Sequence, residues 1–331
     1  MGAVMTFYKL FIIYLAQHSA MPQAMTVAQG DVMNAKGFTL NDDFGIAEQL
    51  AFRDAGGGFI VIDVDNSQCT ASIAMQGAHL MRWNPKGEEP VIWMSPVAKL
   101  AQGKSIRGGV PICWPWFGAH ASEASFPGHG FARTVAWDVI ATAALDDGST
   151  SISFRIAEIN RELWPYDAPA EMHMVIGSKL EMELVTENRG EETITVGDAL
   201  HTYFCVSDIS RIAVRGLDGC DYLDKVGPAA RRTQKHDIRI ASEVDRIYFD
   251  QGQDIVIEDP GLDRGIRIEK RGSHSTIVWN PWIDKCRAMG DFGSDQGFLG
   301  MVCVESANAA EDVVQLTAGD RHSLWVRYSV E

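Results

Sequence analysis

The chain has 331 residues, a hydrophobic content of 46% and a formal net charge of −15 at pH 7. This length suits two average domains or one large all-β domain, and the apolar content is sufficient for a full core. The acidic balance argues against a nucleic-acid partner, which would require a basic face. If the protein binds an anion, it must gather a few cations locally.

The first 25 residues are expected to lie outside the folded domain. Residues 7–16 are apolar except for Lys9, and this run is much shorter than the roughly 20 residues that span a membrane. The run also makes a poor signal peptide, because no charged side chain precedes it. Met21 and Met25 follow closely, as they would if the start were assigned too far upstream. We therefore expect residues 1–25 to be disordered or non-native, residues 37–331 to form a single domain, and no membrane partner.

One short helix is predicted, followed by many strands. Residues 42–54 place Phe44, Ala47, Leu50 and Ala51 on one helical face. Strands are predicted at residues 60–64, 152–156 and 180–185, a hairpin at 255–258 and 266–269, and closing strands at 313–316 and 323–330. A dozen or more strands without a linker predict an all-β fold: one large antiparallel β-sandwich with few short helices, in which a groove crosses one sheet.

The cysteines and histidines give no sign of a metal site or a disulfide scaffold. Six cysteines are widely spaced, without a C-x-x-C pair, so reduced thiols in a cytoplasmic protein are the simpler interpretation. Nine histidines are scattered, without an H-E-x-x-H motif or a close His/Cys pair. We expect no metal and no cofactor, and we expect a monomer.

Two segments place an arginine in a loop rich in glycine. Residues 106–118 contain Arg107 among apolar and aromatic neighbours, with a Gly-Gly pair and two prolines. Residues 127–133 read Pro-Gly-His-Gly-Phe-Ala-Arg and contain His129 and Arg133. Glycines allow the backbone to approach a ligand closely, and a guanidinium offers a planar fork suited to phosphate or carboxylate. Stacking of each arginine on a ring is about as plausible as ligand binding.

Two further segments carry a titratable side chain at the end of an apolar run. His201 follows a short apolar strand and precedes Thr-Tyr-Phe, and Glu305 ends the almost wholly apolar run that begins at Phe298. A carboxylate in that position is expected to be half desolvated, which raises its pKa and its usefulness as a base. A single histidine near aromatic rings is more often a packing residue, so the argument depends on the combination of these groups.

These four segments, together with Glu243-Val244-Asp245-Arg246-Ile247-Tyr248, closely resemble the hexose-6-phosphate mutarotases. These are the glucose-6-phosphate 1-epimerases of the aldose 1-epimerase superfamily. The resemblance runs from about Gly37 to the C-terminus, and it implies a galactose-mutarotase-like β-sandwich. One departure is Gly128, where the family often has glutamine, which puts one hydrogen bond to the sugar in doubt.

The resemblance implies a role for six residues. His201 resembles the general acid of the family, and Glu305 resembles its general base. The implied substrate-binding residues are Arg107, His129, Arg133 and Asp245. The implied partner is a small sugar phosphate, and the chemistry requires no cofactor.

The implied reaction interconverts the α and β anomers of a hexose 6-phosphate by opening and closing the sugar ring. A carboxylate and an imidazolium suit its two proton transfers, and an ionised Glu305 is expected to raise the pKa of a protonated His201. The acid limb of the pH profile is therefore assigned to Glu305 and the alkaline limb to His201. Two alternatives remain: an aldose 1-epimerase for unphosphorylated sugars, and a non-catalytic carbohydrate-binding protein.

Overall fold

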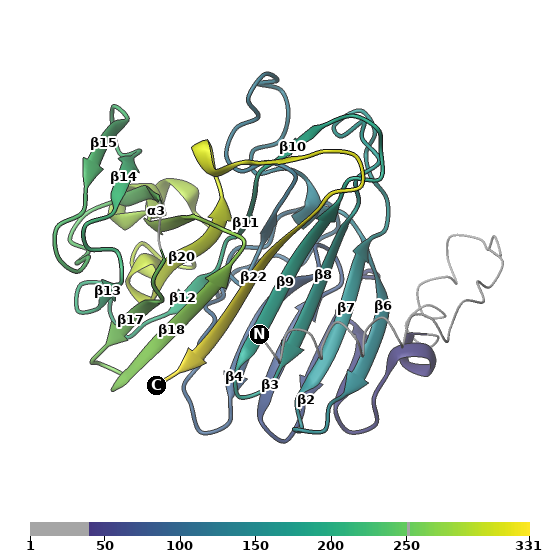
Figure 1. Cartoon of the computed structure of the whole chain (residues 1–331). Coiled ribbons are helices and arrows are strands. Elements are labelled where there is room, and N and C mark those ends of the chain that lie inside the picture. Colours follow the sequence, from purple (N-terminus) through teal and green to yellow (C-terminus); the bar gives the residue numbers. More distant parts are fainter. Residues whose placement is uncertain (1–39, 250–251) are drawn as a thin grey trace. The chain divides into compact units, whose positions relative to one another are not determined.

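The computed structural model describes residues 40–249 and 252–331, which belong to one compact unit spanning Gly37–Glu331. The predictions for residues 1–25 and for a domain start at residue 37 concern positions outside the described residues. Antiparallel strands make up most of the regular secondary structure in the described chain (Figure 1). The predicted all-β class is thus confirmed.

One eight-stranded sheet, called the site sheet below, carries the candidate catalytic residues. Its strand order is β15-β14-β16-β19-β20-β11-β5, and β12 also pairs with β20. Its strands are β5 (Ile112–Cys113), β11 (Asp198–Leu200), β12 (Tyr203–Cys205), β14 (Asp221–Asp224), β15 (Ala230–Thr233), β16 (Val244–Phe249), β19 (Ser275–Asn280) and β20 (Met301–Asn308).

The second eight-stranded sheet, called the backing sheet, has the order β13-β17-β18-β22-β9-β8-β7-β6. Figure 1 shows the long strands from β22 to β6 side by side. Its strands are β6 (Trp137–Ala144), β7 (Thr150–Ile156), β8 (Ala170–Ile176), β9 (Leu180–Glu187), β13 (Ala213–Arg215), β17 (Ile255–Asp259), β18 (Arg264–Arg271) and β22 (Arg321–Val330). The predicted hairpin is β17–β18, and the predicted last strand is β22.

Smaller elements complete the described chain. They are a four-stranded sheet of β1 (Leu50–Asp54), β2 (Ile60–Asp65), β3 (Cys69–Ala74) and β4 (His79–Pro85), a pair of β10 (Ile194–Val196) and β21 (Val314–Leu316), the helix α3 (Trp282–Met289), and the 3-10 turns η1 (Ala132–Thr134), η2 (Gly297–Gly300) and η3 (Ala310–Asp312). Among the described helices, none has the length and apolarity needed to cross a membrane.

Buried side chains join the two large sheets into a sandwich. The Phe204 ring packs edge-on against Tyr328 with ring centroids 5.1 Å apart, and the Tyr328 hydroxyl lies 2.7 Å from Thr202 Oγ1. Trp114, which follows β5, donates from Nε1 to Thr186 Oγ1 on β9 at 2.9 Å. These polar atoms are satisfied across the apolar core, so the sandwich buries them without leaving them unpaired.

The predicted helix over residues 42–54 is wrong beyond its first turn. Residues 40–44 are helical, but Glu48 has a positive φ of 60° and Leu50–Asp54 forms β1, which pairs with β2. Leu50 and Phe52 are buried while Ala51 is exposed. The alternation of a strand therefore fits these residues as well as the helical spacing did, and pairing with β2 decides between the two.

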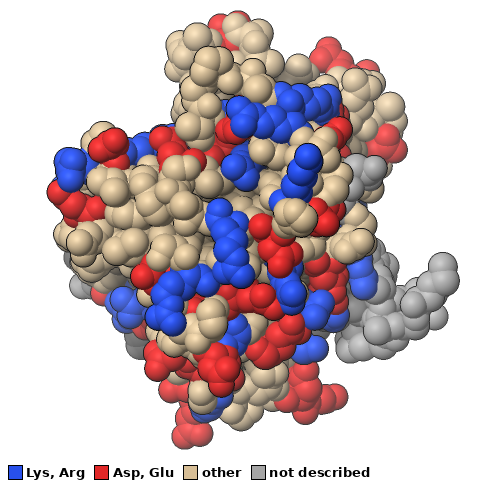
Figure 2. Space-filling view, turned by 90° about the vertical axis from the view of Figure 1, so that its left-hand side faces the viewer, with Lys and Arg blue, Asp and Glu red and all other residues tan. Residues whose placement is uncertain are grey.

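Acidic and basic side chains are interspersed on the face of the molecule shown in Figure 2. No single basic patch covers this view. This mixture of charges on the face shown agrees with the net charge of −15.

Candidate active site

Strand register places Asp245 and three further residues in one row across the site sheet. Asp245 on β16 pairs with Trp279 on β19, and Trp279 pairs with Cys303 on β20. Cys303 pairs in turn with Tyr203 on β12. Directly paired residues project from the same face of a sheet, and so does the residue two positions along a strand. Glu305 therefore lies on the same face as this row, called the site face below.

His201 and Glu305, the predicted acid and base, meet on the site face. His201 Nε2 lies 3.4 Å from Glu305 Oε1. His201 follows β11, and its backbone N–H donates to the Pro111 carbonyl at 3.0 Å, which fixes its position. Glu305 differs from the sequence-based expectation because it lies inside β20 and only 1% of its side chain is exposed. The structure thus buries this carboxylate more completely than its place after an apolar run indicated.

Burial moves the two pKa values of this pair in opposite directions. Desolvation, aided by the negative charge of Asp245, raises the pKa of Glu305 well above its ordinary value. Desolvation, aided by the charge of Arg133, lowers the pKa of His201 well below its ordinary value. The expectation that Glu305 would raise the pKa of His201 is therefore wrong, since burial penalises the charged form of each group.

His129 is held beside His201 by a strained turn. Their ring centroids are 5.9 Å apart, and His129 adopts a positive φ of 65° between two glycines. No residue with a side chain fits at Gly130 without a clash, because a Cβ there would lie 1.9 Å from the Trp114 carbonyl oxygen. Burial and the positive charges of Arg133 and Lys225 lower the pKa of His129 to about 3. Non-glycine residues with positive φ often mark functional sites, and this histidine is neutral at ordinary pH.

Arg107 is fixed by two partners and an aromatic ring. Its Nε donates to Asp291 Oδ2 at 2.9 Å, and its Nη1 donates to the Tyr203 hydroxyl at 2.7 Å. The guanidinium also lies 5.2 Å from the centroid of the Phe292 ring. Tyr203 in turn stacks on His201 with centroids 5.0 Å apart. Arg107 is thus connected to the His201–Glu305 pair through a single tyrosine, and Nη2 retains N–H groups for a ligand.

Arg133 and the loop that carries Arg107 both interact with a buried histidine, His79. Arg133 Nη2 donates to the Gly128 carbonyl at 2.9 Å. His79 Nε2 lies 2.9 Å from the Gly108 carbonyl oxygen, and the charge of Arg133 contributes, after burial, to lowering the pKa of His79 to about 4. Both arginine-bearing segments therefore lie near His79. No feature of the sequence singled out this histidine.

Asp245 is accompanied by two lysines that sequence reasoning missed. Lys225 Nζ lies 3.6 Å from one Asp245 oxygen, and Lys285 Nζ lies 4.0 Å from the other. Lys225 also lies 6.0 Å from the centroid of the Phe117 ring, and its charge opposes the rise in the pKa of Glu305. A lysine on a turn is common in any sequence, so only the fold identifies Lys225 as a site residue.

Cys303 places a thiol next to the His201–Glu305 pair. One ligand atom from each of His201, Cys303 and Glu305 lies within 4.8 Å of the other two. A nitrogen, a sulfur and an oxygen donor at these separations could hold a metal ion. The expectation that no histidine and cysteine lie close together holds along the chain but not in space.

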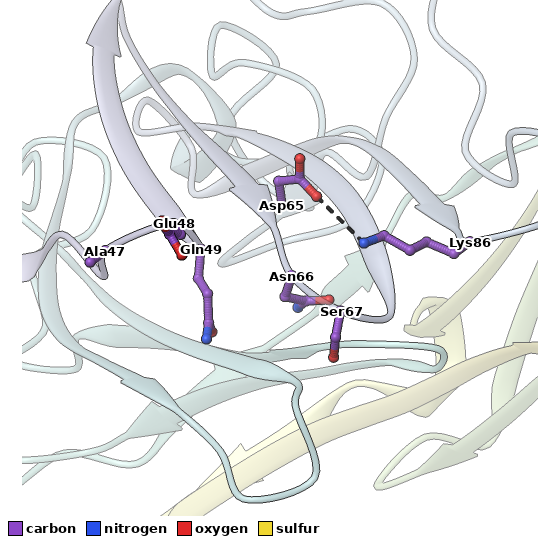
Figure 3. Close-up of a pocket in the computed structure, with 7 residues that line it drawn as sticks. All are labelled: Ala47, Glu48, Gln49, Asp65, Asn66, Ser67 and Lys86. Carbon is purple, nitrogen blue, oxygen red and sulfur yellow. Dashed lines mark ion pairs between the residues drawn. The ribbon is translucent and has the colours of Figure 1, made fainter.

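One surface pocket lies apart from these residues. It has a volume of about 360 Å³ and is lined by Ala47, Glu48, Gln49, Asp65, Asn66, Ser67 and Lys86 (Figure 3). The Lys86 ammonium lies 3.9 Å from Asp65. The lining contains none of the six predicted site residues, so this pocket is separate from the candidate active site.

The fold is a β-sandwich, and one sheet face carries a buried carboxylate–imidazole pair whose two groups could act as a base and an acid. The sequence profile of the aldose 1-epimerase family matches residues 61–329. The chain belongs to this family. The fold, the enzyme class and the family resemblance predicted from the sequence are thereby confirmed.

Named relatives agree with this placement. An Escherichia coli protein named "Putative glucose-6-phosphate 1-epimerase" is 39% identical over 254 residues, which cover 76% of this chain and 84% of the relative. A Cenchrus ciliaris protein of the same name is 33% identical over 263 residues, 76% of this chain and 78% of the relative. The crystal structure of a "putative mutarotase (YeaD)" from Salmonella typhimurium is 33% identical with a TM-score of 0.80, covering 87% of this chain and 95% of that structure.

Proposed function

We propose that this chain is a mutarotase that interconverts the α and β anomers of a hexose 6-phosphate, with D-glucose 6-phosphate as its substrate. One observation carries the proposal: a buried carboxylate lies 3.4 Å from an imidazole on a sheet face flanked by two arginine-bearing loops. The names of the relatives support glucose 6-phosphate as the substrate.

Glu305 and His201 perform the two proton transfers in this proposal. Glu305 takes the proton of the C1 hydroxyl while His201 gives a proton to the ring oxygen, so the C1–O5 bond breaks and C1 becomes a carbonyl carbon. Rotation about C1–C2 then presents the other carbonyl face. Reversal of both transfers closes the ring as the other anomer and restores both groups, because the reaction is a net isomerisation without a consumed reactant.

The reaction starts from a pair that shares one proton. Because burial raises the pKa of Glu305 and lowers that of His201, the uncharged arrangement of carboxylic acid and neutral imidazole is favoured in the free enzyme. Transfer of that proton across the 3.4 Å gap produces the carboxylate base and the imidazolium acid. The cation Lys225 favours this charged arrangement, since it opposes the rise in the pKa of Glu305. Arg133 stabilises the carboxylate in the same way but disfavours the imidazolium, because its charge also lowers the pKa of His201.

Arg107 and Arg133 are the proposed anchors for the phosphate. Each keeps guanidinium N–H groups beyond those already committed to protein partners. Asp245 and His129 are the proposed partners of the sugar hydroxyls, with Asp245 held in place by two lysines. An aldose 1-epimerase for unphosphorylated sugars would use the same acid–base pair, so these arginines are what distinguish the two functions.

We also infer that the chain is a cytoplasmic monomer and that it requires no metal or cofactor for catalysis. Within the described part of the chain, Cys69, Cys113, Cys205, Cys286 and Cys303 form no disulfide, which favours a reducing compartment. Light scattering on the purified chain tests the monomer, and a mass near 36.4 kDa is expected.

Removal of either catalytic group tests the function. Glu305→Gln and His201→Ala are each expected to reduce anomerisation of glucose 6-phosphate by about 10²–10⁴-fold, the usual contribution of a general acid or base. Saturation transfer between the two anomeric protons measures the rate, and circular dichroism verifies that the fold is intact. Near wild-type exchange in either folded variant would rule out this pair as the catalytic residues.

A further inference from the structure

The group of His201, Cys303 and Glu305 has the composition of a transition-metal site. The three residues come from separate positions: His201 follows β11, while Cys303 and Glu305 alternate along β20 and project from the same face. Their donor atoms all lie within 4.8 Å of one another. Imidazole, thiolate and carboxylate are the three donor types that bind Zn²⁺ in proteins.

The spacing requires only a small adjustment to hold an ion. Ligands of a tetrahedral Zn²⁺ at about 2.0–2.3 Å lie about 3.3–3.8 Å apart. The His201–Glu305 separation of 3.4 Å already falls in that range, and side-chain rotation of Cys303 would bring the sulfur in. Within the described part of the chain, Glu305 Oε2 and His201 Nδ1 are buried and have no hydrogen-bond partner. An ion would supply a partner to the carboxylate.

We propose that His201, Cys303 and Glu305 form a site for a thiophilic divalent cation such as Zn²⁺, which inhibits the enzyme by occupying its catalytic pair. The inhibition rests on the proposed function, whereas the binding does not. The ion reaches the site along the edge of His201, whose side chain is 13% exposed. It replaces the thiol proton of Cys303 and the proton shared by His201 and Glu305, and both pass to solvent.

This site would be inhibitory because the metal and the sugar need the same atoms. A bound ion occupies the lone pair of Glu305 that takes the C1 hydroxyl proton, and it blocks protonation of His201. Zn²⁺ should therefore raise KM for glucose 6-phosphate and leave kcat unchanged. Thiolate ligands favour Zn²⁺ over Mg²⁺, so millimolar Mg²⁺ should leave the rate unchanged. A chelator should restore, and never reduce, the activity.

The test compares two buried cysteines. Cys303→Ser keeps the size of the side chain but removes the soft ligand, and it should retain mutarotase activity while the Zn²⁺ concentration for half inhibition rises about tenfold or more. Cys113→Ser is the matched control, because Cys113 is equally buried and its sulfur lies 3.6 Å from His129 Nδ1. This variant should remain as sensitive to Zn²⁺ as the wild type.

Co²⁺ gives a readout that does not depend on activity. In the wild-type chain without sugar, Co²⁺ should produce the near-ultraviolet sulfur-to-cobalt absorption, and Cys303→Ser should abolish it. Equal Zn²⁺ sensitivity of Cys303→Ser and wild type, or relief of inhibition by Cys113→Ser alone, would overturn the proposal. A chain that binds Co²⁺ through Cys303 but does not anomerise sugar phosphates would refute the proposed function and leave the metal site standing.

Discussion

At the residue scale, the order of two pKa values decides how the proposed catalytic pair, His201 and Glu305, titrates. The pKa of Glu305 is raised and that of His201 is lowered. As pH falls, the second proton that the pair binds therefore goes to His201. As pH rises, the last proton that the pair loses comes from Glu305. The rate profile should remain bell-shaped. Its acid limb should belong mainly to His201 and its alkaline limb mainly to Glu305, the reverse of the order expected from the sequence.

Nitrogen NMR of the imidazole checks this assignment directly in the free enzyme. The His201 resonance should change over the acid limb of kcat/KM and remain that of a neutral ring through the alkaline limb. If the His201 ring loses its proton along the alkaline limb, that limb belongs to His201, as expected from the sequence. Burial would then not have lowered the pKa of His201 below that of Glu305.

The same burial predicts a stability that falls as pH rises. The pKa of Glu305 in the folded state lies well above 4.5, the ordinary value for the group, so the folded chain holds this proton more tightly than the unfolded chain. That contribution is fully present below about pH 4.5 and is lost as pH rises through the folded pKa, by up to about 1.4 kcal/mol per pH unit.

Glu305→Gln removes this dependence and should therefore be more stable than the wild type at pH 8. The difference in urea midpoint between the two proteins should grow from pH 5 to pH 8. An equal or lower midpoint for the variant at pH 8 would show that the carboxylate is compensated in the folded state.

The titratable residues of the candidate site could be selected from the sequence, but the residues that contact them and change their properties could not. His201 and Glu305 could be selected because a titratable group after an apolar run is unusual. Lys225 could not, since its 3.6 Å approach to Asp245 depends on the pairing of β14 with β16. Asp291 was missed for the same reason: its contact with Arg107 joins residues 184 positions apart.

At the element scale, β20 shows why sequence reasoning placed Glu305 at a strand end. The apolar run stops before Glu305, but the strand continues to Asn308 with every residue buried. Ser275 Oγ donates to the Ala307 carbonyl at 2.6 Å, and Asn308 Oδ1 lies 2.9 Å from His322 Nε2. Polar residues continue a buried strand where such partners exist, and partners from distant strands are not visible in the sequence.

The turn that holds His129 gives a prediction at this scale. Gly130→Ala combines a positive φ of 68° with a Cβ only 1.9 Å from the Trp114 carbonyl oxygen. It should lower the free energy of unfolding by roughly 3 kcal/mol or more and reduce activity by displacing His129.

Gly118→Ala is the matched control for this substitution. Gly118 has a similar φ of 74°, but a Cβ there meets no atom within 4 Å. It should cost only about 1 kcal/mol, measured by the same urea titrations. Equal losses in the two variants would mean that φ alone, and not close packing against Trp114, constrains this turn.

At the scale of the whole molecule, the charge of −15 opposes the proposed substrate. A phosphate dianion is repelled at long range, so its affinity must come from contacts within a Debye length of about 8 Å. Arg107→Ala should lower kcat/KM for glucose 6-phosphate about tenfold or more, because a charge-assisted bond contributes roughly 1.5–3 kcal/mol. Arg133→Ala should behave similarly, with an added loss if it displaces His129.

Arg267→Ala is the control for net charge. Arg267 pairs with Asp254 and Glu331 on the backing sheet, so its loss changes the total charge equally without touching the site. It should leave kcat/KM within twofold of wild type. If Arg267→Ala and Arg107→Ala lowered kcat/KM equally, the effect would come from the net charge of the protein and not from a contact with the phosphate.

Sensitivity to the phosphate is the central claim, and one comparison tests it most directly. Saturation transfer between anomeric protons gives catalysed exchange rates for glucose 6-phosphate and for glucose with the same enzyme, before and after Arg107→Ala. We expect kcat/KM for glucose 6-phosphate to exceed that for glucose at least tenfold in the wild type, and Arg107→Ala to remove most of that excess while hardly changing the rate for glucose. Equal rates for the two sugars in the wild type, or equal losses in the variant, would contradict a phosphate-specific mutarotase.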